Sequence, residues 1–262
     1  MTWRGGLPDS HQPYAHWTYI QSRHKMVPMS HPPFAITVDL VLMTVARGIL
    51  SVLVQRRGEE PYVDALALPG GFVGIKETLD EAAMRVLAEK AGVAAQDSAW
   101  LEQLYTFGDP QRDPRMRTVS IAYFALLPHA VLERAVTSKA DLALRPVTEP
   151  GEPLAFDHAA IIAAAHERLR GKLDYAPLAF SLLPDLFTLR DLQTVHEAIT
   201  GTVLNKPAFR RRMLDTGWIE ATGQRESDKP FRPAELYSRT SPPPSRQCRP
   251  RSDLIAQRSR SP

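Results

Sequence analysis

The sequence predicts an α/β sandwich followed by a smaller domain of two helices and a β-hairpin. Two β-rich runs, 34–45 and 49–55, are joined by a short turn. A glycine turn at Gly70 and Gly71 then leads into residues 79–91, where apolar residues recur at helical spacing. Further β-rich runs and a second helical stretch follow. Strands that alternate with helices in this order are typical of layered α/β domains.

The composition is that of a protein with substantial hydrophobic cores. Its 262 residues and 44% apolar content are sufficient for two small domains. The net charge of +3 is too small to indicate a nucleic-acid partner by itself. Cys248 is the single cysteine, which excludes an internal disulfide and fits a reducing cytoplasm. The N-terminus has no apolar core segment before a small-residue cleavage site, so we expect no signal peptide. The longest apolar run, 34–53, is interrupted by Asp39, Arg47 and Gly48, so we expect strands there and no membrane span.

The chain divides into four segments by composition. Residues 1–33 are rich in proline and histidine without periodicity, and we expect a flexible leader. Residues 34–171 hold the α/β domain. Asp157 is placed to cap the last helix of this domain. Residues 172–240 form the second domain, and 241–262 are an arginine- and proline-rich tail with the composition of a disordered segment. Within the α/β domain we expect further strands at 101–107, 118–127 and 142–147, and a helix at 158–169 that stops at Gly171.

The run from Gly71 to Val93 carries a spaced pattern of glycine, acidic, basic and aliphatic residues. Gly71 is followed after five residues by Glu77, and after seven more by Arg85-Val-Leu-Ala-Glu89-Lys-Ala-Gly92-Val93. This pattern resembles the Nudix box, which has a glycine, five residues, a glutamate, seven residues and then R-E-U-x-E-E-x-G-U, with U an aliphatic residue. The resemblance implies a Nudix-like α/β/α sandwich that binds a nucleoside diphosphate compound.

Two acidic residues of that box are replaced, which removes most of its metal ligands. Val86 and Lys90 stand where the box has glutamates, whereas Glu77 and Glu89 are retained. Residues 86, 89 and 90 lie about one helical turn apart, so three carboxylates there would converge on one Mg²⁺ ion. A valine offers that ion no ligand, and a lysine repels it. We therefore expect sensing without hydrolysis, with no catalytic residue, bound metal or other cofactor. The alternative is an active Nudix hydrolase that recruits a carboxylate from another loop.

The second domain has the element order of a winged helix-turn-helix. Thr188 begins a capping-box-like start to a helix over 189–200. After a short turn, Asn205 can cap a basic helix over 206–215. Two β-rich runs within 218–237 then suggest a hairpin. Helix, turn, basic helix and hairpin is the order of winged DNA-binding domains.

The basic helix indicates a nucleic-acid partner. Arg210, Arg211 and Arg212 sweep an arc of its surface, at about 100° per residue. The fork of an arginine donates to phosphate oxygens and guanine edges. We expect these arginines to contact DNA, together with the residues at the helix starts, which are Thr188, Asn205 and Lys206. The alternatives are a solvated charged face and a docking module for a protein partner.

Longer segments resemble the Nudix-related transcriptional regulators of NAD metabolism. The matching segments lie between residues 34 and 240, and they include Leu104-Tyr-Thr-Phe-Gly-Asp-Pro-Gln-Arg-Asp-Pro-Arg115, Pro153-Leu-Ala-Phe-Asp-His158, 169–180 and 187–193. The resemblance implies a Nudix-like domain that senses ADP-ribose and a winged helix that represses genes of NAD synthesis or salvage as a homodimer. Two winged helices related by two-fold symmetry imply an operator with an inverted repeat in double-stranded DNA.

The ligand site is expected around the glycine turn. Backbone N–H groups of Gly70 and Gly71, and the start of the following helix, suit a diphosphate. Lys90 is a candidate for the positive charge that a metal would supply, and we expect Glu77 and Glu89 to orient the helix and the turn. Arginines in loops that can border the cleft are Arg56, Arg57, Arg112 and Arg115.

Overall fold

The computed structural model describes residues 34–94, 101–173, 176–226 and 233–240. All of them belong to one compact unit that begins at Phe34. The predicted leader, 1–33, and the predicted tail, 241–262, lie outside the described residues. None of the helices in the described ranges combines the length and the apolar character needed to cross a membrane.

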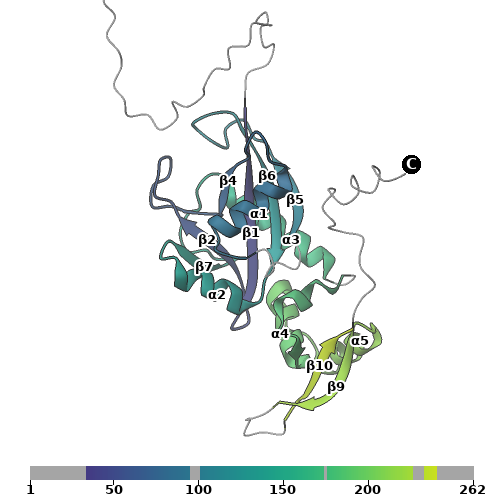
Figure 1. Cartoon of the computed structure of the whole chain (residues 1–262). Coiled ribbons are helices and arrows are strands. Elements are labelled where there is room, and N and C mark those ends of the chain that lie inside the picture. The colour runs from purple at the N-terminus through teal and green to yellow at the C-terminus, as the bar shows by residue number, and fades with distance from the viewer. Residues whose placement is uncertain (1–33, 95–100, 174–175, 227–232, 241–262) are drawn as a thin grey trace, which may run out of the picture. The chain divides into compact units, whose positions relative to one another are not determined.

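A seven-stranded mixed sheet forms the centre of the first domain (Figure 1). Its strands are β1 (Ala35–Ala46), β2 (Ile49–Arg56), β3 (Leu66–Ala67), β4 (Gly70–Phe72), β5 (Leu101–Phe107), β6 (Thr118–Leu126) and β7 (Leu142–Pro146). The main path runs β3-β2-β1-β6-β5, with β4 paired to β1 and β7 paired to β2. The pair β1–β6 is parallel, and the other described pairs in this sheet are antiparallel. The strand β1 therefore lies at the middle of the sheet.

Alternate side chains of β1 enter two separate cores, as the period-two geometry of a strand requires. Val38, Leu40 and Leu42 are fully buried in the core that α1 and α2 cover. Val41 and Met43 are fully buried in the core that α3 covers. The three helices are α1 (Leu79–Glu89), α2 (His129–Ser138) and α3 (His158–Lys172). Helices thus cover both faces of the sheet, and the predicted α/β/α sandwich is confirmed.

The second domain is small and has the predicted element order. Its elements are the 3₁₀ helix η2 (Pro177–Leu182), β8 (Leu186–Phe187), α4 (Leu189–Thr200), α5 (Lys206–Asp215), β9 (Ile219–Arg225) and β10 (Glu235–Arg239). The strands form a sheet in the order β8-β10-β9. Phe209 and Met213 of α5 are buried, and the ring of His196 on α4 meets Phe209 edge-on, with ring centroids 5.1 Å apart. The predicted winged helix-turn-helix is confirmed, with β9 and β10 as the wing.

The structure differs from the sequence prediction at three helices. Neither α2 nor η2 is predicted from the sequence. Pro128, the N-cap residue of α2, has no side-chain group that can cap a helix. The helix α3 continues to Lys172, because Gly171 is not among the residues with the positive φ that ends a helix. The predicted domain boundary at 171/172 therefore falls inside the last turn of α3.

Candidate ligand-binding and DNA-binding sites

Close packing against β1 fixes the glycine turn. A β-carbon at Gly70 would lie 2.2 Å from Oδ1 of Asp39, whose side chain is buried, and 3.0 Å from the backbone carbonyl oxygen of Val38. A β-carbon at Gly71 would lie 3.2 Å from Cγ2 of Val86. The helix α1 then starts at a capping box with Thr78 as its N-cap. The turn and the start of α1 are therefore held in a fixed relation to the sheet.

Glu77 joins the turn to α1 through Arg85. Its carboxylate accepts hydrogen bonds from Nε of Arg85 at 3.0 Å, from Nη2 of Arg85 at 2.6 Å and from the N–H of Gly74 at 2.5 Å. Arg85 also donates to the carbonyl oxygen of Phe72 at 2.9 Å. The hydrogen bonds from Arg85 and Gly74 lower the pKa of Glu77 to about 2. The Glu77 carboxylate is thus ionised at neutral pH and committed to this ion pair.

The replaced box positions hold an isopropyl group and an ammonium group where the box has two carboxylates. Val86 is fully buried under the glycine turn, and Lys90 is exposed at the C-cap of α1. Oε2 of the largely exposed Glu89 lies 3.5 Å from Nη1 of Arg85. Nζ of Lys139 adds a further cation, since it donates to the carbonyl oxygens of Glu89 and Lys90. In the part of the chain that the structure describes, no group of three or more His, Cys, Asp or Glu side chains is placed to hold a metal ion. These donors do not fit the oxygen-rich coordination of Mg²⁺.

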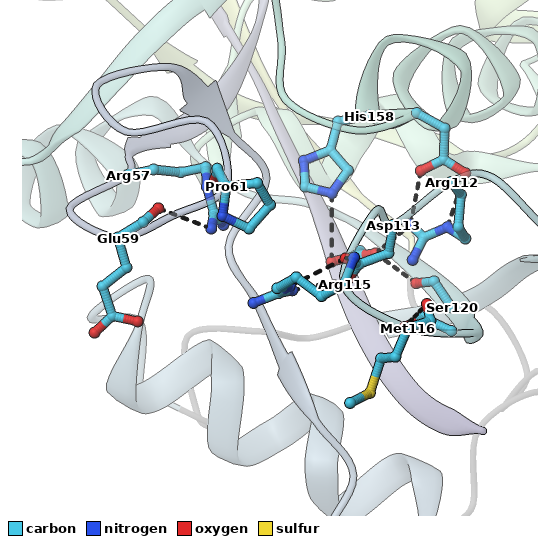
Figure 2. A network of polar contacts seen from close by, with 12 residues as sticks. Arg57, Glu59, Pro61, Arg112, Asp113, Arg115, Met116, Ser120 and His158 are labelled. Carbon is cyan, nitrogen blue, oxygen red and sulfur yellow. Dashed lines mark hydrogen bonds and ion pairs between the residues drawn. The ribbon is translucent and has the colours of Figure 1, made fainter. Parts of the chain in front are cut away.

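A buried ion-pair network lies against the glycine turn (Figure 2). Nε and Nη2 of Arg112 donate to the carboxylate of Asp157 at 2.9 Å and 2.7 Å, and Nη2 lies 3.3 Å from Oδ2 of Asp39. Oγ of Ser120 donates to the same Oδ2 at 2.5 Å. Asp157 is the N-cap residue of α3, as predicted. Its carboxylate accepts hydrogen bonds from Arg112, and its side chain makes no cap hydrogen bond. The side chain of Arg112 is 4% exposed. This residue, predicted to bind the ligand, is therefore engaged in ion pairs inside the protein.

His158 extends the network in its neutral form. Its Nδ1 accepts the N–H of Leu68 at 2.9 Å, which places the ring hydrogen on Nε2. Nε2 faces Oδ1 of Asp39 at 3.7 Å. Burial is the main cause that lowers the pKa of His158 below its ordinary value. Asp39 is therefore the point at which the glycine turn, the loop of Arg112, β6 and the start of α3 meet.

Loss of the Arg112 charge is expected to destabilise the protein strongly. Arg112→Ala leaves the buried Asp39 without its counter-charge, which typically costs about 3–5 kcal/mol. Urea unfolding followed by tryptophan fluorescence measures the change. Arg117→Ala is the control, because Arg117 is an exposed arginine of the same loop, and its effect is expected to stay within about 0.5 kcal/mol. Equal unfolding midpoints for the two variants would contradict the structural role of the network.

Arginine and aromatic side chains gather beside this network. Cζ of Arg57 and Cζ of Arg115 lie 4.8 Å and 5.7 Å from the ring centroid of Phe156. The ring of Tyr62 meets Phe156 edge-on, with centroids 5.0 Å apart, and Cζ of Arg115 lies 5.9 Å from the centroid of Phe72. Tyr62 and Phe72 are 44% and 42% exposed. We refer to Arg57, Tyr62, Phe72, Arg115 and Phe156 as the Phe156 cluster.

The structure thus separates the four loop arginines that the sequence predicts around the ligand. Arg57 and Arg115 meet at one aromatic ring, whereas Arg112 is buried. Arg56 points elsewhere, since its Nη2 lies 3.2 Å from Oε2 of Glu152 and its Nη1 donates to the carbonyl oxygen of Asp64. Sequence reasoning misses Asp39, Asp157, His158 and the aromatic members of the cluster as site residues. A single aspartate within the apolar run of β1 was the available signal for Asp39.

The predicted DNA-contact residues at the helix starts have different roles. Oγ1 of Thr188 accepts the N–H of Asp191 at 3.1 Å, and Thr188 is buried, so it caps α4 from inside the domain. Oδ1 of Asn205 accepts the N–H of Ala208 at 3.0 Å and caps α5. Lys206 is exposed at the first turn of α5. Asn205 and Lys206 are therefore accessible to a partner, whereas Thr188 is not.

The three adjacent arginines of α5 also differ in their surroundings. Nη2 of Arg210 donates to Oη of Tyr237 at 3.2 Å and lies 4.0 Å from Oε2 of Glu235. Oη of Tyr237 in turn donates to Oε2 of Glu235 at 2.8 Å. Arg210 thereby connects α5 to β10 of the wing. Arg211 is exposed, and Cζ of Arg212 lies 5.6 Å from the ring centroid of a phenylalanine on its own helix.

Comparison with known proteins identifies both domains. Residues 33–164 match the NUDIX domain, and residues 179–238 match the NrtR DNA-binding winged helix domain. A relative from Acinetobacter baylyi, named ADPR responsive transcriptional repressor NtrR, is 38% identical over 218 residues, which are 79% of this chain and 82% of the relative. This chain belongs to the NrtR family. The predicted resemblance to Nudix-related regulators is confirmed.

Two further similarities concern the NrtR architecture and its Nudix part. The crystal structure of Shewanella oneidensis NrtR complexed with a 27-mer DNA is 35% identical in sequence, has a TM-score of 0.70, and is matched over 78% of this chain and 93% of that one. An ADP-ribose pyrophosphatase from Methanocaldococcus jannaschii is 35% identical over 72 residues, which are 28% of this chain and 41% of the relative. As a member of the NrtR family, this chain carries a DNA-binding winged helix after its Nudix domain.

Proposed function

We propose that this member of the NrtR family is an ADP-ribose-responsive repressor of genes for NAD synthesis or salvage. The observation that carries the proposal is a DNA-binding winged helix joined to a Nudix domain whose box lacks two metal-binding glutamates. The Acinetobacter relative supports ADP-ribose as the effector, because its name states that response and its similarity extends over 79% of this chain. The proposed partner is an inverted-repeat operator in double-stranded DNA, bound in the cytoplasm by a homodimer.

The described contacts between α3 and α4 offer a route for the response. Nε2 of His166, on α3, lies 2.8 Å from the carbonyl oxygen of Ile199, near the end of α4. The start of α3 carries His158 and follows Asp157, both members of the network beside the glycine turn. A ligand that changes the position of this helix would act on the first helix of the winged domain. The ligand must favour the arrangement that does not bind DNA, because equal affinity for both arrangements shifts nothing.

A gel-shift assay on the promoter region beside the gene tests the proposal. The full chain is expected to retard this DNA, and ADP-ribose is expected to release it. Unrelated DNA of the same length controls for non-specific phosphate contacts. A complex that forms equally on both DNAs would argue against an operator, and a complex that persists at saturating ADP-ribose would argue against the effector.

The competing function is Mg²⁺-dependent hydrolysis of ADP-ribose, which the likeness to the Methanocaldococcus pyrophosphatase favours. We expect hydrolysis near background, since Val86 and Lys90 supply no metal ligand and Glu77 is committed to Arg85. Release of AMP from ADP-ribose in millimolar Mg²⁺, followed by chromatography, measures the rate. An active ADP-ribose hydrolase in the same buffer serves as the control. Turnover at a rate comparable with that control would establish the alternative function.

A further inference from the structure

We propose that a cavity between the Nudix domain and the winged domain is a second ligand site, and that it takes a small organic cation with an apolar body. Its volume is about 430 Å³, which is within the range of small-molecule sites. Its walls come from the β1–β2 turn, the segment after β7, the helices α3 and α4, and the loop after α4. The described residues of this lining include neither the glycine turn nor the Phe156 cluster. A ligand here would be distinct from the proposed ADP-ribose effector, and its binding does not depend on the proposed function.

Packing contacts around the cavity fix the positions of its walls. In the β1–β2 turn, Gly48 has a φ of 76°, and a β-carbon there would lie 3.6 Å from Cγ2 of Thr194 on α4. Nε2 of His166, on α3, lies 2.8 Å from the carbonyl oxygen of Ile199. Ile199 is buried in the same core as Leu50 of β2. Figure 1 shows α4 beside the end of the sheet where this turn lies. A ligand would therefore enter a site whose walls are already in place, which avoids the cost of ordering them.

Glu197 of α4 gives the cavity a negative charge. Its Oε1 accepts hydrogen bonds from Nε2 of Gln193 at 2.8 Å and from the N–H of Leu204 at 2.8 Å. These two hydrogen bonds are the main causes that lower the pKa of Glu197, so its carboxylate is ionised at neutral pH. Lys206 also lowers this pKa, but it lies outside the lining. In the described part of the chain, Oε2 of Glu197 accepts no hydrogen bond, and no lysine or arginine lines the cavity.

The neighbouring polar groups favour a ligand that donates hydrogen bonds. His166 donates from Nε2 to the carbonyl oxygen of Ile199, so Nδ1 of its neutral ring is an acceptor. The helix α4 ends at Gly201, which also lines the cavity, and the C-terminal end of a helix carries partial negative charge. An ammonium group has three donors, no acceptor and a positive charge. It therefore complements the free carboxylate oxygen and the imidazole nitrogen of this lining.

The apolar part of the lining favours a hydrocarbon body on that cation. Leu50 and Val147 contribute to the walls, and two further lining residues, Ile49 and Val203, are 52% and 95% exposed. A hydrocarbon chain that covers these side chains removes apolar surface from water, which is favourable. A purely polar cation gains nothing from them. The expected ligand is therefore an amine that carries several carbon atoms.

Calorimetry of the full chain with hexylamine as the probe tests the chemistry of the site. Hexanoate has a chain of the same length with the opposite charge, and hexan-1-ol has no charge. Both are expected to bind at least about tenfold more weakly than hexylamine, because they lose the ion pair with Glu197. Hexanoate or hexan-1-ol binding as tightly as hexylamine would overturn the preference for a cation. Absence of heat from hexylamine at about 10 mM would overturn the site itself.

Two variants test whether the probe occupies this cavity. Glu197→Gln keeps an oxygen for Gln193 and Leu204 but removes the charge, so it is expected to weaken hexylamine binding by about tenfold and to leave hexan-1-ol binding unchanged. Glu133→Gln is the matched control, because it removes a carboxylate that is 67% exposed on α2, outside the lining. Its effect is expected to stay within about twofold.

Ala198→Phe fills the cavity from α4 and leaves Glu197 in place, so it is expected to prevent binding of hexylamine and hexan-1-ol alike. Urea unfolding of each variant checks that it is folded, and the comparison of the three probes on the wild-type chain needs no variant. Wild-type hexylamine affinity in both folded variants would show that the amine binds elsewhere and would overturn the assignment. Because none of the probes is a nucleotide, that result would leave the proposed response to ADP-ribose standing.

Discussion

Replacing Arg210, Arg211 and Arg212 together with alanine is expected to abolish operator binding while the Nudix domain stays folded. Contacts with phosphates supply most of the affinity of a DNA-binding domain, and these three arginines lie on its predicted recognition helix, α5. Fluorescence anisotropy with a labelled operator measures the loss. Calorimetry with ADP-ribose reports whether the Nudix domain is intact. Wild-type affinity in the triple variant would show that α5 is not the recognition helix.

Single variants distinguish direct contacts from support of the wing. Arg211 is exposed, so Arg211→Ala is expected to lower the slope of log affinity against log salt by about one, as for a lost phosphate contact. Arg210 is hydrogen-bonded to Tyr237, so Arg210→Ala is expected to weaken binding with a smaller change of slope. Tyr237→Phe keeps the charge of Arg210 and removes its hydrogen bond to the wing. An Arg210→Ala slope equal to that of Arg211→Ala would assign Arg210 to a phosphate instead.

Local signals account for the elements that the sequence predicts well. The β-rich composition of residues 34–45 and the caps at Thr188 and Asn205 depend on residues close together in the chain. The structure places these three elements within one or two residues of the prediction. The short helix α2 follows a proline and has no side-chain cap, so its local signal is weak. Gly171 was expected to end α3, yet a glycine ends a helix only where the chain takes a positive φ there.

The candidate ligand site depends on contacts that no local pattern contains. Asp39, Arg112 and Asp157 come from β1, a loop and the start of α3, and only the fold brings them together. The loop arginines have the same local chemistry, but Arg56 ends β2 and faces Glu152, whereas the next residue, Arg57, turns towards Phe156. Charge and loop position identified the set of arginines. Only the structure shows which of these arginines is buried, which is paired with Glu152 and which lie in the Phe156 cluster.

Binding of ADP-ribose is expected to persist in EDTA and to release the operator. In an active Nudix site the metal neutralises the diphosphate, and here Val86 and Lys90 offer that ion no ligand. Arg57, Arg115 and Lys90 are the candidates for the missing positive charge; the first two lie over the ring of Phe156, and Lys90 lies at the end of α1. Calorimetry with and without Mg²⁺ measures the metal dependence. Binding that requires Mg²⁺ would show that a metal site survives the loss of the two glutamates.

The strength of the response can be bounded by linkage. Moving the operator from almost fully bound to almost fully free requires ADP-ribose to prefer the released arrangement by about 10⁴-fold. The coupling is reciprocal, so saturating operator must weaken ADP-ribose binding by the same factor by which ADP-ribose weakens operator binding. Two titrations, one of each ligand in the presence of the other, measure this factor twice. If calorimetry shows that ADP-ribose binds but the affinity for DNA does not fall, the proposed sensing mechanism is wrong. The proposal that the chain binds DNA would be unaffected.

The contact between α3 and α4 provides a variant that separates coupling from binding. His166 belongs neither to the Phe156 cluster nor to α5, and its described hydrogen bond is the 2.8 Å contact with the carbonyl oxygen of Ile199. His166→Ala is therefore expected to keep both individual affinities and to reduce the coupling factor. A coupling factor equal to that of the wild type would mean that the response reaches the winged helix by another contact. Loss of operator affinity without ligand would mean that His166 holds the DNA-binding arrangement itself.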